Sequence, residues 1–193
     1  MALELNGTTG VSLVQDGVVT AADLASGAIT SAALPAGSVL QVVQSVDNTL
    51  TSSTVTANSF FATPLSGSIT PSSTSNKVLV TVCISRAHTS GNTIAFRLKR
   101  GGTIIGVGQT SGSNRPEESF GIEVFGNDDG HSGTAASFTF LDSPSTTSST
   151  TYSVDAMAEG TTFTMNRGIS FADITEPQHG TTISTITLME IAG

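Results

Sequence analysis

The chain of 193 residues contains no tryptophan, one tyrosine and one cysteine, and only 11% of its residues are charged. The single cysteine, Cys83, excludes an internal disulfide, and its place in an alternating apolar stretch predicts a small core residue. Seven Lys and Arg against fifteen Asp and Glu give a net charge of −8, and no basic residue precedes Lys77. Nucleic acids and anionic membrane surfaces are bound by clustered basic side chains, so both classes of partner are excluded.

Long apolar runs are missing as well. No stretch reaches the roughly 20 apolar residues of a membrane-spanning helix. The first five residues, MALEL, lack the basic region and the apolar run of a signal peptide. We therefore expect a protein that is made in a cytoplasm, does not insert into a membrane and is not secreted by an ordinary signal.

The sequence patterns of catalytic, cofactor and metal sites are also absent. Asp128, Asp129 and His131 share a polar loop but lack the oxygen spacing of a calcium site. His88 and His179, expected in polar loops, have no spacing suited to zinc. No serine stands in a G-x-S-x-G elbow, and no phosphate-binding glycine loop is followed by a lysine. The sequence predicts a protein that is not an enzyme and holds no cofactor and no metal.

The most regular feature of the chain is a ten-residue repeat between Gly17 and Gly37. Glycine recurs every tenth residue, a β-branched apolar residue follows two places later, and leucine occupies the eighth place. Two full rounds are too few to bury a core within one subunit, so the repeat should pack against its copies around a symmetry axis. The residues predicted to make this oligomerisation stem are Val19, Leu24, Ile29, Leu34 and Val39.

After Gly37 the apolar period becomes two, which indicates strands. The clearest strand is Lys77 to Ile84, expected to be central and covered on both faces, and the clearest hairpin joins Thr93–Arg100 to Thr103–Val107 through two glycines. About eight to ten short strands without a long helix predict an antiparallel β-sandwich, with a jelly roll as the preferred topology.

The last strand, Thr182 to Ile191, is apolar on both faces. Ile186 and Leu188 fall on one face, and Met189 and Ile191 fall on the other. Because one face is enough for a core, Met189 and Ile191 are candidate subunit contacts.

These features divide the chain into three parts. Residues 1–16 form an attachment arm with turn clusters, for which a disordered terminus is the alternative. Residues 17–37 form the stem, and residues 38–193 form the sandwich head.

Five phrases of the sequence resemble virion structural proteins of tailed bacteriophages, especially those of cyanobacteria and other marine bacteria. In chain order they are LNGTTG (5–10), PAGSVLQVVQ (35–44), ITPSSTSNKVLV (69–80), FLDSP (140–144) and STITLMEI (184–191). The resemblance spans nearly the whole chain and implies a trimeric fibre, spike or capsid decoration protein with a β-sandwich head, on the virion surface. It implies no catalytic residues.

The N-terminal part of this chain is shorter than the stems of long fibre proteins. A twenty-residue stem reaches about 65 Å at most, at roughly 3.3 Å per residue. This length suits a knob on a shell, so we rank a capsid decoration (cement) protein, with the major capsid protein as partner, above a tail fibre attached to tail proteins.

The alternative is a receptor-binding tail fibre or tailspike that recognises a host glycan or surface protein. The candidate receptor-facing residues lie in long polar loops, which commonly carry binding sites. They are Arg115, Asp128, Asp129, His131 and His179. Sugar sites commonly use aromatic platforms, and this chain offers no tryptophan and only Tyr152, so this reading ranks second.

Overall fold

The protein is all-β in the part that the computed structural model describes, which is residues 33–109, 112, 116–123, 133–167 and 180–193. The predicted arm and most of the predicted stem lie outside these residues. The strands are β1 (Val39–Asp47), β2 (Thr51–Thr54), β3 (Phe60–Ile69), β4 (Lys77–Thr89), β5 (Thr93–Arg100), β6 (Thr103–Ile105), β7 (Phe120–Glu123), β8 (Thr134–Asp142), β9 (Thr150–Ala158), β10 (Thr162–Met165) and β11 (Ser184–Ile191).

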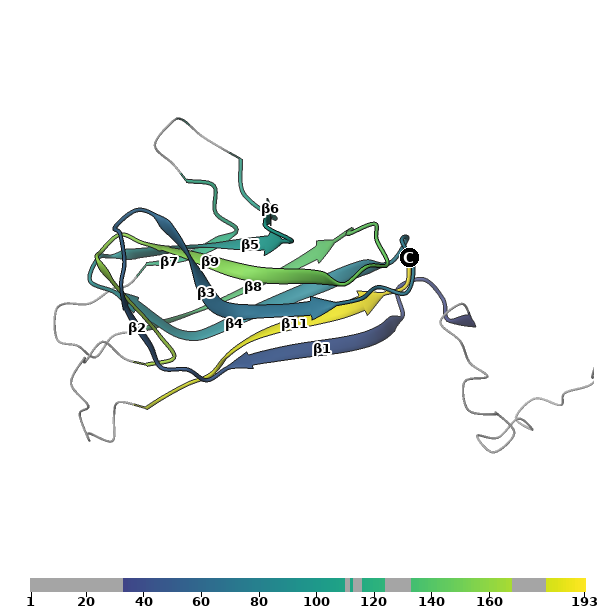
Figure 1. Ribbon diagram of the computed structural model, residues 1–193, viewed down its shortest axis with the longest axis horizontal. Coiled ribbons are helices and arrows are strands. Elements are labelled where there is room, and N and C mark those ends of the chain that lie inside the picture. Colours follow the sequence, from purple (N-terminus) through teal and green to yellow (C-terminus); the bar gives the residue numbers. More distant parts are fainter. Residues whose placement is uncertain (1–32, 110–111, 113–115, 124–132, 168–179) are drawn as a thin grey trace, which may run out of the picture.

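The strands form two antiparallel sheets, as expected for a β-sandwich. The first sheet has the order β1-β11-β4-β10-β2, and β8 pairs with the other edge of β4. The second sheet has the order β3-β9-β5-β6, and β7 pairs with β5 beside β6. Figure 1 shows the two sheets curled toward one another, with β1 and β11 along one side and β5 and β9 along the other.

The core lies between the sheets because each strand turns every second residue inward. Val78, Val80, Val82 and Ile84 of β4 are fully buried, and they meet inward residues of the second sheet such as Phe96 in a single apolar cluster. Each buried aliphatic or aromatic side chain contributes about 1.5–3 kcal/mol relative to its exposed state. The alternation of apolar and polar residues therefore accounts for both the strands and the apolar core.

At one side of the sandwich, a glycine on β3 allows the two sheets to lie close together. A Cβ at Gly67 would lie 3.2 Å from Ser45 Oγ of β1 and 3.4 Å from Ile186 Cγ2 of β11, so its absence lets β3 approach the first sheet. β3 is an edge strand, and its register against β9 is irregular between Ala62 and Ser66. Pro64 falls within this irregularity, where the missing N–H costs no ladder bond.

The other side is closed by stacked phenylalanines. The rings of Phe96, Phe120, Phe138 and Phe140 follow one another with centroid distances of 4.9, 5.3 and 6.2 Å. Offset aromatic pairs add about 0.5–1.5 kcal/mol beyond the area they bury. These rings join β5 and β7 of the second sheet to β8 of the first.

The predicted hairpin is confirmed. Gly101 and Gly102 have φ of 54° and 90°, the two positive values that a type I′ turn requires. Two details differ from expectation. β4 continues to Thr89, and β2 was not predicted because its sequence, TSST, has no apolar alternation.

A buried asparagine holds the end of the sandwich where β1 finishes. Asn166 has φ of 64° and no exposed surface. Its Nδ2 donates to Asp47 Oδ2 at 2.8 Å, to Asp47 O at 3.0 Å and to Thr49 O at 3.1 Å, and its Oδ1 accepts from Ser184 Oγ at 2.7 Å. One side chain thus ties the end of β10 to β1 and to the first residue of β11.

Two substitutions of Asn166 should destabilise the fold to different degrees. Asn166→Gly keeps the positive φ but removes the side-chain bonds, and it should lower the free energy of unfolding by about 2–3 kcal/mol. Asn166→Ala adds left-handed backbone strain and should cost about 1 kcal/mol more. Urea unfolding measures both.

Asn58→Gly is the matched control, because Asn58 has φ of 58° and is exposed. Its unfolding free energy should stay within about 0.5 kcal/mol of the wild type. Equal effects at the two asparagines would contradict the role given to the Asn166 side chain.

Candidate interaction surface

The outer face of the first sheet carries three rows of uncharged side chains across β1, β11, β4 and β8. The antiparallel registers place these residues directly opposite one another, so each row runs straight across the four strands. From β1 to β8 the rows are Val42–Met189–Leu79–Leu141, Gln44–Thr187–Thr81–Thr139 and Val46–Thr185–Cys83–Ser137. We call these twelve positions the neutral face.

The neutral face alternates apolar and hydroxyl-rich rows. In the first row Val42 is 57% exposed and Leu141 is 47% exposed, with half-buried side chains between them. In the second row Gln44 Nε2 donates to Thr187 Oγ1 at 2.8 Å, and the hydroxyls of Thr81 and Thr139 lie 3.4 Å apart. The four polar side chains of the middle row therefore bond to one another in two pairs.

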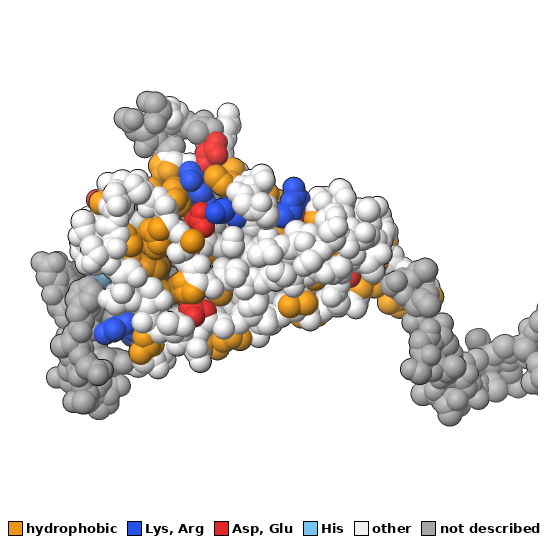
Figure 2. Space-filling model, viewed as in Figure 1, with side chains coloured by type: hydrophobic (Ala, Val, Ile, Leu, Met, Phe, Trp, Pro, Cys, Tyr) orange, Lys and Arg blue, Asp and Glu red, His pale blue; other side chains and the backbone are white. Residues whose placement is uncertain are grey.

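Exposed large apolar side chains gather on this sheet. Among the described residues they all belong to strands of the first sheet or to segments flanking β1 and β11: Leu34, Val39, Val42, Val46, Leu50, Leu141 and Ile183. Figure 2 shows orange side chains along the lower edge of the molecule, over β1, and also at the upper left, where several blue and red side chains lie among them. This concentration makes the neutral face a candidate interaction surface.

The candidate contact residues fall on or beside the neutral face. Met189 lies in its first row, and Ile191 lies one pair further along β11, between Val39 and Lys77. Of the predicted stem residues, Leu34 is 38% exposed and Val39 is 52% exposed. Val19, Leu24 and Ile29 lie outside the described residues.

Two predictions from the sequence were wrong. Cys83 is exposed on the neutral face rather than buried in the core, because residues 77–84 of β4 turn their odd-numbered side chains outward. Within one chain this part of β4 is thus covered on one face only, whereas residues 87–89 are buried. His88 lies in β4 and is buried, not in a polar loop, and this burial lowers the pKa of its imidazole.

A buried carboxylate fixes the end of the sandwich that adjoins the predicted stem. Glu190 Oε1 accepts from Ser72 N at 2.5 Å, from Ser72 Oγ at 2.7 Å and from Asn76 Nδ2 at 2.6 Å. Its Oε2 accepts from Gln41 Nε2 at 2.6 Å. We call these four residues the Glu190 clasp. It connects β11 to β1 and to the turn between β3 and β4.

Two further hydrogen bonds hold the backbone next to the clasp. Gly193 N donates to Asn76 Oδ1 at 3.1 Å, and Gly37 N donates to Ala192 O at 2.8 Å. Burial alone would raise the pKa of Glu190, but its hydrogen bonds to Asn76, Gln41 and Ser72 outweigh this and leave the pKa below its usual value. Glu190 is therefore charged at neutral pH although only 1% of it is exposed.

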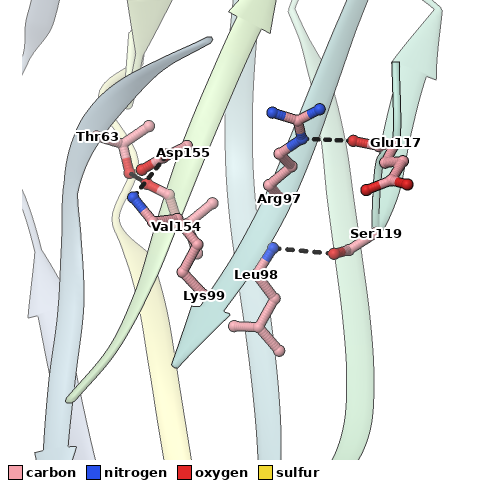
Figure 3. A network of polar contacts seen from close by, with 8 residues as sticks. All are labelled: Thr63, Arg97, Leu98, Lys99, Glu117, Ser119, Val154 and Asp155. Atoms are coloured by element: carbon pink, nitrogen blue, oxygen red, sulfur yellow. Dashed lines mark hydrogen bonds and ion pairs between the residues drawn. The ribbon is translucent and has the colours of Figure 1, made fainter. Parts of the chain in front are cut away.

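The outer face of the second sheet is charged. Lys99 Nζ lies 2.9 Å from Asp155 Oδ2, and the Arg97 guanidinium lies 3.5 Å from the centre of the Phe60 ring. Figure 3 shows Arg97 Nε donating to the Glu117 carbonyl and Ser119 Oγ accepting from Leu98 N. These contacts hold the segment before β7 against β5.

A hollow of about 810 Å³ lies on this second sheet, where β5, β7 and β9 adjoin. Four carboxylates are among its lining residues, namely Glu117, Glu118, Glu123 and Glu159. Glu159 Oε2 accepts from Asn92 N at 2.8 Å, and burial raises the pKa of Glu118. The hollow can therefore accept cationic or hydrogen-bond-donating groups.

The candidate receptor-facing residues all lie outside the described residues: Arg115, Asp128, Asp129, His131 and His179. Within the part of the chain that the structure describes, no three His, Cys, Asp or Glu side chains form a group that could hold a metal ion. No helix of that part has the length and apolar character needed to cross a bilayer.

Comparison of the chain with models of known protein families and with curated proteins found no match.

Removing the charge of the clasp should destabilise the fold strongly. In Glu190→Gln the new amide faces a shell of donors, so at least one buried donor loses its acceptor, and the free energy of unfolding should fall by about 2–4 kcal/mol at neutral pH. Glu123→Gln is the control, since Glu123 is exposed, and it should change the value by less than about 0.5 kcal/mol. Urea unfolding of both variants makes the comparison.

The clasp should also make the wild type sensitive to acid. Because the folded pKa of Glu190 lies below its unfolded value of about 4.3, its contribution is complete above that pH and is lost as the pH falls through the folded pKa. The stability difference between wild type and Glu190→Gln should therefore be steady near neutral pH and shrink as the pH falls from about 4.3 to 3. A difference that stays constant or grows over this range would contradict the assignment.

Proposed function

We propose that this chain is a non-enzymatic structural protein of a bacteriophage virion surface, a homotrimer with a stem at residues 17–37 and a jelly-roll head at residues 38–193. The observation that carries the proposal is the neutral face. It exposes apolar side chains across four paired strands, as subunits that remain associated do. The five phrases that resemble phage virion proteins give the proposal its biological setting.

The strand order supports a jelly roll. β1-β11-β4-β8 of the first sheet and β3-β9-β5-β7 of the second are two sets of four strands. Eight strands in two sheets with this alternation correspond to two Greek keys, an architecture common in viral capsid domains.

The titratable groups described so far support a structural role. Besides the Glu190 clasp, Arg100 Nη1 lies 2.8 Å from Asp142 Oδ1, and Tyr152 OH donates to Asp142 Oδ2 at 2.7 Å. Burial and the bond to Asp142 raise the pKa of Tyr152 above its usual range, so the phenol stays protonated. These groups join β5, β8 and β9, and Tyr152 is buried, which removes it as an aromatic platform for sugars.

Among virion positions we favour capsid decoration. Residues 1–16 would contact the major capsid protein, and the short stem would place the head just above the shell. A trimer matches local three-fold positions of an icosahedral shell, and preferential binding to the assembled shell stabilises it by mass action.

A second candidate is a receptor-binding tail protein. The acidic hollow on the second sheet favours it, since this hollow lies away from the neutral face and would stay accessible in an oligomer built on that face. A host surface group with amine or hydroxyl donors fits the four carboxylates.

The purified chain should be a trimer. Native mass spectrometry at micromolar concentration should give about three times the 19.6 kDa of one chain. A stable monomer under these conditions would overturn the proposal.

Copy number should separate the two virion positions. Gel densitometry against the major capsid protein should give tens to hundreds of copies per particle, because a shell has many three-fold positions. About six or eighteen copies would instead favour the tail protein. Absence of the chain from purified particles would reject both.

A further inference from the structure

We propose that the neutral face is the surface through which copies of this chain contact one another, with the three faces turned toward a common axis. The inference rests on the homotrimer proposed above and adds where the contact lies. The occupant of the face is a second copy of the chain, for three reasons that are independent of the sequence resemblance.

The first reason is charge. The chain has a net charge of −8, so most of its surface would repel an identical copy. The three rows of the neutral face contain no charged residue, and Lys77 lies beyond them, opposite Ile191. A face without charges can meet its own copy without like-charge repulsion.

The second reason is the position of the predicted stem. β1 is the edge strand of the neutral face, and residues 33–38 lead directly into it. The bond from Gly37 N to Ala192 O holds this junction beside the end of β11. Leu34 and Val39, both exposed, therefore lie at the end of the chain segment that the repeat predicts to be on the symmetry axis. Stem and face can share one axis.

The third reason is polar satisfaction. A face can be buried cheaply only if its donors and acceptors have partners. The pairs Gln44–Thr187 and Thr81–Thr139 give each polar side chain of the middle row one partner within that row. The apolar row beside them has no polar side-chain atoms, so covering both rows costs less than covering unpaired polar side chains.

The geometry also predicts how the copies meet. A three-fold contact is heterologous, so the β1 end of one face, with Val42, packs near the β8 end of the next, with Leu141. The twelve positions cross four strands about 4.8 Å apart and cover about five residues of each strand, which gives a face of roughly 300 Å². This is less than half of the roughly 800 Å² per partner of a standard interface, so residues outside the neutral face must also contribute to a stable trimer.

A charge placed in the apolar row tests the inference. Val42→Glu changes an exposed residue and should leave the single chain folded, but the trimer should dissociate to monomers at micromolar concentration. Ser66→Glu is the matched control, because Ser66 is exposed on β3, the edge strand of the second sheet. This control should remain trimeric in native mass spectrometry.

The single thiol gives a second measurement that needs no destabilising variant. Cys83 is exposed in one chain but would be covered in the trimer, so its reaction with a disulfide reagent should be at least about tenfold slower in the wild type than in Val42→Glu. A wild-type trimer whose Cys83 reacts as a free thiol, or a Val42→Glu variant that stays trimeric, would overturn the location of the contact. A monomeric wild type would overturn the proposed function itself.

Discussion

The arrangement of this protein depends on keeping one carboxylate charged in a buried place. Glu190 stands on the inward face of β11, where a lone charge would be unstable, and four hydrogen bonds from three residues make it stable. Its donors come from β1 and from the turn before β4, so satisfying the charge requires that both lie against β11. The first and last strands of the sheet and the junction with residues 33–38 are positioned together by this one requirement.

The two sheets share a core but differ in what they present outward. On the neutral face the first sheet presents valine, leucine, methionine, cysteine, glutamine, serine and threonine, and the charged residues of β1 and β11, Asp47 and Glu190, are turned inward. The second presents Arg97, Lys99 and Asp155 on neighbouring strands. This division separates a side suited to contact with identical subunits from a side suited to water or to a charged ligand. A single domain can thereby associate and still leave one surface available.

Much of the fold could be predicted from the sequence, because its causes are local. Period-two alternation located most strands, and Gly101-Gly102 located the hairpin turn. The open side of the first sheet could not be predicted, since Leu79 and Cys83 look as apolar as Val80 and Val82, and only strand order decides which are covered. The Glu190 clasp was also missed, because its partners are distant in sequence. β3 continues through Pro64, because the edge position and the irregular register accommodate a residue without an N–H.

The place of β11 has a consequence for how the chain can fold. β11 lies between β1 and β4, so the first sheet has a gap at its centre until residues 184–191 join it. Before that moment β1 has no strand partner in the sheet, and one edge of β4 over residues 77–84 presents unpaired N–H and C=O groups, which favour aggregation. Pairings between the two ends of a chain are slow to form because a long loop must close first. Completion of the first sheet therefore waits for the last strand, and the neutral face is formed only after residues 184–191 have paired.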